Sequence, residues 1–157
     1  MKRLFLTGLL ALVAASGYAQ SGSASVSAKT GYALDWETVT LGADYRYNFL
    51  PEFRLAPSLT YMIRNQGPSA WYMDLDCHYI VEVSELFSFY PIGGIGISIW
   101  QKDLLNRRED AARLGINIGL GGELQLSPEI SVGVDMKYNL ITTYDQALVA
   151  IRVAYHL

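Results

Sequence analysis

The feature that most constrains this chain is an alternation of side chains with a period of two residues, which recurs along almost its whole length. In the segment ISVGVDMKYN (residues 130–139), apolar residues alternate with polar or small ones. This period is typical of a β-strand whose two faces meet different surroundings. It predicts eight strands separated by turn-forming residues. They span Ala24–Leu34, Thr38–Asn48, Phe53–Ile63, Ala70–Val83, Ser88–Trp100, Arg113–Leu126, Ile130–Leu140 and Ala147–Leu157.

The connections between the predicted strands alternate between short and long. Those after the second, fourth and sixth strands are FLPE, SELF and SPE, which contain the turn formers Pro, Ser or Glu. Those after the first, third, fifth and seventh strands are DWE, RNQGPS, QKDLLNRREDAA and ITTYDQ, and three of these are longer than any of the other set. This asymmetry is typical of outer-membrane barrels, which have short periplasmic turns and longer outer loops.

The first 19 residues have the features of a secretory signal peptide. Lys2 and Arg3 give it a positive start. Leu4–Ala15 form an apolar run that is too short to span a bilayer comfortably. The small residues Gly17 and Ala19 stand where a cleavage site requires them. We therefore expect export and removal of this segment.

Cleavage would leave residues 20–157, a length that suits one domain. Without Lys2 and Arg3 the 12 basic residues of the chain fall to 10, against 15 acidic ones. A nucleic-acid partner is therefore not expected, because phosphate binding requires a basic surface. The single cysteine, Cys77, cannot form an intramolecular disulfide.

The polar faces of the predicted strands are rich in Gly and Ala as well as in charge. Small residues suit a solvated surface poorly, but they fit the crowded interior of a narrow barrel. The apolar faces are almost free of charge, which suits contact with lipid. We therefore expect a lumen charge network, with His156 beside it, formed by Lys29, Asp44, Arg46, Arg54, Asp74, Asp76, His78, Glu82, Arg113, Glu123, Asp135, Lys137 and Arg152.

Aromatic residues on the apolar faces gather near the two ends of the strands. Two bands of amphipathic rings are expected where lipid headgroups begin. The band nearer the longer connections would contain Tyr32, Tyr61, Trp71 and Tyr138. The band nearer the shorter ones would contain Tyr47, Phe53, Tyr79, Phe89 and Tyr155.

Strands of this length can cross a bilayer when they are tilted. In lipid every backbone N–H and C=O must be paired within the protein, so the sheet must close on itself. Eight strands form an allowed barrel whose interior is just filled by side chains. The predicted fold is therefore all-β: an eight-stranded antiparallel up-and-down transmembrane β-barrel. An even strand number puts both termini on one side, which we expect to be the periplasm.

The whole chain after the signal peptide resembles the small eight-stranded outer-membrane barrels, such as the OmpA transmembrane domain and OmpX. The last strand, ALVAIRVAYHL, is similar to the C-terminal assembly signal of that family, although it ends in Leu157 rather than Phe. The resemblance implies a monomeric, porin-like protein of the Gram-negative cell envelope. Its expected partners are outer-membrane lipids, lipopolysaccharide and the outer-membrane assembly machinery.

The expected function is structural or concerned with surface interaction, with a lumen plugged by paired charges. Unpaired charges in a narrow barrel would cost several kcal/mol each. If the seventh connection is centred between Thr143 and Tyr144, then Asp135 lies opposite Arg152 and Lys137 opposite Ala150. A similar estimate puts Arg46 close to Asp76 and His78. In the fifth connection, Lys102, Arg107 and Arg108 are the candidates for contacts with phosphate groups or a partner.

Three other functions remain as alternatives: a narrow channel for small solutes, a soluble lipocalin-like binding protein, and a lipid A-modifying enzyme. A lipocalin would carry Gly-x-Trp on its first strand, and none is present. A hydrolase needs a Ser beside a His, yet neither His78 nor His156 has such a partner on its own strand face. We therefore expect no enzymatic activity.

We expect no cofactor and no metal either. In DLDCH, Asp74, Asp76 and His78 share one face, but residues i and i+2 lie about 6.6–7 Å apart along a strand. Three such residues converge poorly on one ion.

Overall fold

The computed structural model describes residues 22–157 except 66–67, 105–106 and 142–144, and of residues 102–104 and 107–111 it describes the backbone alone. The predicted signal peptide lies outside this part of the chain. The strands are Ala24–Ala33 (β1), Thr38–Asn48 (β2), Phe53–Met62 (β3), Ser69–Tyr79 (β4), Val81–Glu82 (β5), Phe87–Leu104 (β6), Arg107–Gln125 (β7), Ile130–Ile141 (β8) and Gln146–His156 (β9). The described residues contain no helix long and apolar enough to cross a membrane.

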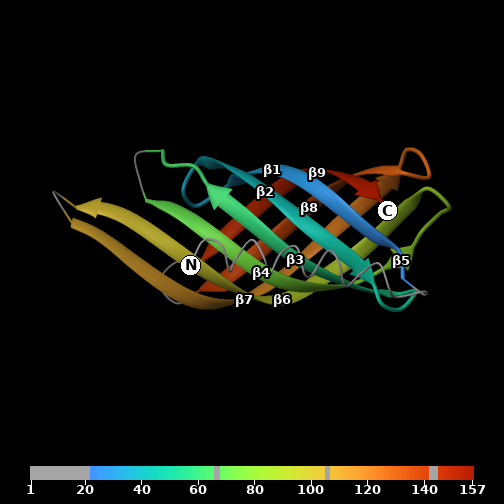
Figure 1. Cartoon of the computed structure of the whole chain (residues 1–157), viewed down its shortest axis with the longest axis horizontal. Helices are drawn as coiled ribbons and strands as arrows, with labels where there is room; N and C mark the ends of the chain where they lie inside the picture. The colour runs from blue at the N-terminus through green and yellow to red at the C-terminus, as the bar shows by residue number, and fades with distance from the viewer. Residues whose placement is uncertain (1–21, 66–67, 105–106, 142–144) are drawn as a thin grey trace.

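The strands form one closed antiparallel barrel (Figure 1). Consecutive strands pair from β1 to β4 and from β5 to β9, β9 pairs with β1, and β4 pairs with β6. The short β5 continues β4 in the same register, since His78 lies opposite Ile92 and Val81 opposite Phe89. Between them the ladder is interrupted near Pro91, which has no N–H to donate. The predicted eight-stranded, up-and-down fold is confirmed, with β4 and β5 acting as one strand.

Burial alternates along the strands in the sense opposite to that of a soluble protein. On β2, Leu41 on the outer face is 51% exposed, whereas Arg46 on the inner face is 1% exposed. The nine predicted girdle aromatics all lie on outward-facing positions, where Tyr61 and Trp71 pack at 4.6 Å and Phe53 and Tyr79 at 5.2 Å between ring centroids. An apolar exterior around a polar interior is what lipid contact requires.

We call the end of the barrel at which β1 begins and β9 ends the turn end, and the opposite end the loop end. The turn-end connections are residues 49–52, 83–86 and 126–129. At the loop end, 34–37, 63–68, 105–106 and 142–145 connect the strands. Only one of these is longer than four residues, so the predicted contrast in loop length is largely wrong.

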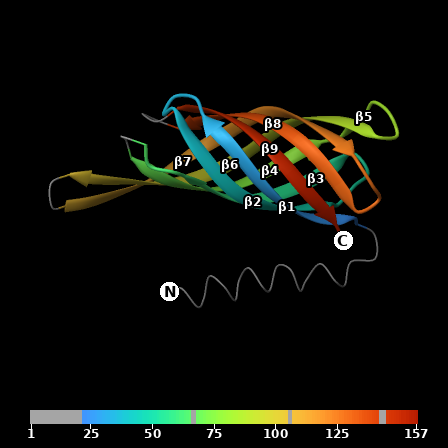
Figure 2. The ribbon, with the colours of Figure 1, turned by 90° about the horizontal axis from the view of Figure 1, so that it is seen from above.

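The expected fifth loop, residues 101–112, is instead mostly strand. Lys102 pairs with Glu109 and Leu104 with Arg107, so β6 and β7 continue to within two residues of each other. Because β7 meets β8 only from Gly115 onward, its first eight residues project as part of a two-stranded hairpin (Figures 1 and 2). Charged residues that read as a solvated loop are compatible with a hairpin in water, where the solvent can satisfy its free edge.

A charge on the lipid face should oppose assembly. Val134 points outward, is 48% exposed, and lies between Gly122 and Ile151. We expect Val134→Arg to cost about 2–4 kcal/mol of folding free energy, because the guanidinium would enter hydrocarbon. Urea titration in vesicles, read by the mobility difference between boiled and unboiled samples, measures this. Val134→Leu is the matched control, and equal stability of the two variants would contradict the orientation of the faces.

Candidate functional site

The lumen holds the concentration of charged side chains that distinguishes this molecule. Nearer the turn end, three guanidinium groups and three carboxylates from five strands meet in the interior. All but Asp135 are buried below 9% exposure. We call this group the arginine cluster: Asp44, Arg46, Arg54, Glu123, Asp135 and Arg152.

Glu123 is the centre of the arginine cluster. Its Oε2 lies 2.7 Å from Nη1 of Arg54, 3.2 Å from Nη1 of Arg46 and 3.5 Å from Nη2 of Arg152. Its other oxygen accepts a hydrogen bond from Ser131 at 2.5 Å. A single carboxylate on β7 therefore joins side chains from β2, β3, β8 and β9. Charge-assisted hydrogen bonds of this kind are the strongest available to neutralise buried arginines.

The two aspartates complete the pairing. Asp135 accepts from Nη1 of Arg152 at 2.5 Å and lies 3.7 Å from Nη2 of Arg46. Asp44 accepts from Nε of Arg46 at 2.8 Å and from the Ser27 hydroxyl at 2.6 Å. Each of the three cations in the cluster thus meets at least one carboxylate.

Tyr90 fills the space between the guanidinium groups. Its ring centroid lies 5.7–5.9 Å from the guanidinium carbons of Arg46, Arg54 and Arg152. Its hydroxyl donates to Asp135 and accepts from Arg152, each at 2.6 Å. Gly121 makes this possible, since a Cβ at that position would overlap the Tyr90 ring. This is one reason for the small residues on the polar faces.

A second group, the lysine cluster, lies beyond the first towards the loop end and consists of Lys137, Asp74, Asp76 and Asn117. Nζ of Lys137 donates to Asp74 at 2.5 Å and to Asp76 at 2.9 Å, and Asn117 donates to Asp76 at 2.8 Å. On the neighbouring strand β6, Cβ atoms at Gly94 and Gly96 would overlap the carboxylates of Asp76 and Asp74. Two carboxylates share one ammonium here.

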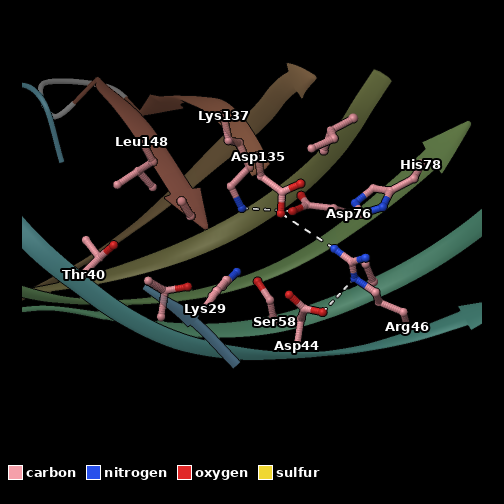
Figure 3. A pocket seen from close by; sticks show the side chains of 14 residues that line it. Lys29, Thr40, Asp44, Arg46, Ser58, Asp76, His78, Asp135, Lys137 and Leu148 are labelled. Carbon is pink, nitrogen blue, oxygen red and sulfur yellow. Dashed lines mark hydrogen bonds and ion pairs between the residues drawn. The ribbon is translucent and has the colours of Figure 1, made fainter. Parts of the chain in front are cut away.

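A cavity of about 40 Å³ lies between the two clusters. Figure 3 shows Lys29, Ser58 and His78 around it, with the pairs of Arg46 and Lys137 at its edges. Lys29 makes no ion pair within 4.0 Å among the described residues. The buried Ser58 hydroxyl and Nδ1 of His78 have no hydrogen-bond partner in the described part of the chain. Most of the residues that line the cavity are charged or polar, but it is too small for a drug-sized ligand.

The predicted register of the last hairpin is wrong by two residues. Asp135 lies opposite Ala150 and Arg152 opposite Gly133, so the two charged residues are diagonal neighbours. They still pair, because the long arginine side chain crosses the space that Gly133 leaves open. The described ion pairs of Arg46 lead to Asp44, Glu123 and Asp135 rather than to Asp76.

Two residues expected in the lumen lie outside it. Glu82 is exposed on β5 near the turn end, and Arg113 is exposed on β7. Both have inward-facing positions in the alternation. The alternation is therefore correct. However, Arg113 precedes Gly115, where β7 first pairs with β8, and Glu82 lies on the short β5, so neighbouring strands enclose neither side chain.

One contact between side chains of neighbouring strands is not predicted by the sequence pattern. Ser131 on β8 lies 2.9 Å from Nε2 of His156 on β9, and both lie near Glu123. The residue pattern within a single strand does not reveal this contact, because cross-strand neighbours depend on register. Ser131 is fully buried and Glu123 is held by arginines. These are the properties of a structural hydrogen bond rather than of an accessible nucleophile.

The acidic residues of DLDCH do not gather around a common point with His78. Lys137 takes both aspartates, and the His78 ring stacks on Tyr90 at 4.8 Å. Among the described residues, no three His, Cys, Asp or Glu side chains are grouped as metal ligands would be. Cys77 lies on the outer face and is a free thiol.

A model of the outer membrane protein β-barrel domain family matches residues 5–156 of the chain. Among curated proteins, none matches it significantly. Of the solved structures, the N-terminal β-barrel domain of Pseudomonas aeruginosa OprF is similar with a TM-score of 0.76 at 13% identity, covering 87% of this chain and 100% of that one. Neisserial surface protein A gives 0.68 at 11% identity, with 85% and 94% covered. Ail of Yersinia pestis gives 0.60 at 13%, with 87% and 97% covered. At these identities the likeness concerns the fold.

Removing the central carboxylate should destabilise the barrel strongly. In Glu123→Gln three guanidinium groups would keep their burial and lose their common partner, which we expect to cost about 3–5 kcal/mol. Equilibrium unfolding in urea measures the free energy. Glu82→Gln is the matched control, because that exposed carboxylate should change stability by no more than about 0.5 kcal/mol. Similar losses for both variants would contradict the central role of Glu123.

Proposed function

Because the chain belongs to the outer membrane protein β-barrel domain family, we propose that it is a non-enzymatic integral protein of the outer membrane, with a plugged lumen and a structural or surface-interaction role. The observation that carries the proposal is the arginine cluster. It links β2, β3, β7, β8 and β9 across the interior with pairs of 2.5–3.7 Å. Opening a path for ions would require separating buried partners, which is costly.

The proposed orientation puts the turn end and both termini in the periplasm and the loop end outside. The projecting β6–β7 hairpin supports this, since outer-membrane barrels extend on the outer side. The last strand, β9, closes the barrel against β1 and would present the assembly signal to the assembly machinery. Lipids would contact the apolar exterior, and lipopolysaccharide would surround the loop end. We propose a monomer, because closure leaves no strand edge inside the membrane.

A lipid-modifying activity is disfavoured by the burial of Ser131. The hydroxyl donates to Glu123, and the surrounding arginines hold that carboxylate in place. A nucleophile must reach its substrate, and this one faces the filled lumen. Absence of labelling by a serine-directed fluorophosphonate in the folded protein supports this view, and labelling that Ser131→Ala abolishes would overturn it.

The surface role would fall to the β6–β7 hairpin, which carries Lys102, Arg107 and Arg108 beyond the last pairing with β4 and β8. Such cations suit the phosphate groups of lipopolysaccharide or other polyanions. The similar barrel of Ail has been solved in complex with the heparin analogue sucrose octasulfate, so the fold can carry an anion-binding surface.

The plug makes a prediction for conductance. Pure protein in planar bilayers should give no stable, large single-channel steps, because an aqueous path through the arginine cluster would require separating its buried ion pairs. The narrow solute channel remains the competing function, and regular large steps from folded protein would establish it. Protein denatured before reconstitution is the control for contaminating porins.

The hairpin makes a separate prediction for binding. Deleting residues 104–110 should leave heat-modifiable mobility unchanged, because this part lies outside the closed barrel. Binding to lipopolysaccharide vesicles should fall, and Lys102→Ala combined with Arg107→Ala and Arg108→Ala should reproduce the loss. Unchanged binding and membrane permeability in both variants would remove the surface role from this segment.

A further inference from the structure

The lumen is apolar where it meets the loop end. Seven inward side chains form a buried layer above the lysine cluster, each no more than 8% exposed, and Trp36 packs against them. We call this layer the aromatic cap: Ala33, Met62, Ala70, Tyr72, Trp100, Ile141, Leu148 and Trp36.

Strands all the way around the barrel contribute residues to the cap layer. Its apolar members come from β1, β3, β4, β6, β8 and β9 and from the connection after β1. On β2 the buried Thr38 and Thr40 complete the layer, and on β7 Gly115 leaves the space that the Ile141 side chain occupies. The ionic clusters and the cap are therefore different layers of the lumen.

Polar contacts pin the aromatic rings of the cap. The Tyr72 hydroxyl donates to Oε1 of Gln146, whose amide group contacts the sulfur of Met62 at 3.6 Å. Nε1 of Trp100 donates to the Ser98 hydroxyl at 2.9 Å, and its ring meets Tyr72 edge-on at 5.9 Å. The strands and these hydrogen bonds hold the two rings in place within the cap.

Trp36 is the one cap residue that does not lie on a strand. It sits in the connection of residues 34–37 and packs on Trp100 with 5.4 Å between ring centroids. The backbone N–H of Ala147 donates to Asp35 at 2.7 Å, and Asn65 donates to the carbonyl of Glu37 at 3.0 Å. These contacts hold the connection over the mouth of the barrel.

The same connection contains a strained residue. Glu37 has φ of 46°, and it is the only non-glycine residue in the described part of the chain with positive φ. The left-handed conformation costs such residues about 1–2 kcal/mol. Glu37 directly follows Trp36, whose indole packs on Trp100.

We propose that the aromatic cap is a hydrophobic gate that seals the loop end of the lumen independently of the ionic clusters, with Trp36 as the member that completes the closure from outside the strands. An apolar constriction excludes water and ions because neither can be solvated within it. The strands fix the other cap residues, whereas Trp36 is held by the contacts of one short connection. The inference rests on the proposed plugged barrel and adds a second closure to it.

Access of a charged reagent to the cavity tests the gate. In a Cys77→Ser background, Ser58→Cys puts a thiol at the wall of the cavity, which meets the cap layer directly at Thr40 and Leu148. The probe is a trimethylammonium methanethiosulfonate applied to folded protein in nanodiscs. We expect Trp36→Ala to raise the labelling rate about tenfold or more, equivalent to about 1.4 kcal/mol of barrier. Trp36→Phe should keep labelling slow.

Trp71→Ala is the matched control, since it removes an outward-facing tryptophan from the same end of the barrel and should leave the rate unchanged. Equal rates for Trp36→Ala and the parent would overturn the gate, as would fast labelling in the parent. Conductance separates the two proposals: Trp36→Ala should still give no large steps, because the arginine cluster remains. Large steps from the parent protein would instead defeat the plug.

Discussion

The pairing of β4 with β6 closes the sheet, and the chemistry of the rest of the molecule depends on that closure. In hydrocarbon an unpaired backbone N–H or C=O costs several kcal/mol, so a membrane-spanning sheet cannot keep a free edge. Closing with eight strands leaves an interior that side chains just fill. Charges placed there have little water, and they must find partners within the wall.

In the two clusters and the cavity between them, lysines and arginines equal carboxylates in number, and most of them pair directly. The arginine cluster contains three cations and three carboxylates, whereas the lysine cluster has two carboxylates for one ammonium. With Lys29, which lines the cavity between the clusters, the lysines and arginines number five against five carboxylates. Among the described residues no carboxylate lies within 4.0 Å of the Lys29 amine, so the two sides face each other across the cavity. Small residues such as Gly96 and Gly121 give these side chains their space.

The sequence predicts the barrel well because face alternation and strand length are local properties. It predicts partners poorly, because these depend on register: a shift of two residues puts Arg152 opposite Gly133, and the contact of Ser131 with His156 is invisible along either strand. The extension of β6 and β7 was hidden by its loop-like charges. The aromatic cap was hidden because inward positions were expected to be polar, although Trp100 and Ile141 occupy them.

Exchange of the arginine side-chain protons tests the central claim most directly, which is that a closed apolar wall encloses buried arginines that are paired with carboxylates. Nε–H of Arg46 donates to Asp44, and Nε–H of Arg54 donates to Asn48, each at 2.8 Å. In deuterated buffer these two protons should persist far longer than that of the exposed Arg113, as read by NMR on the folded protein. Exchange of all three at the same rate would contradict the account.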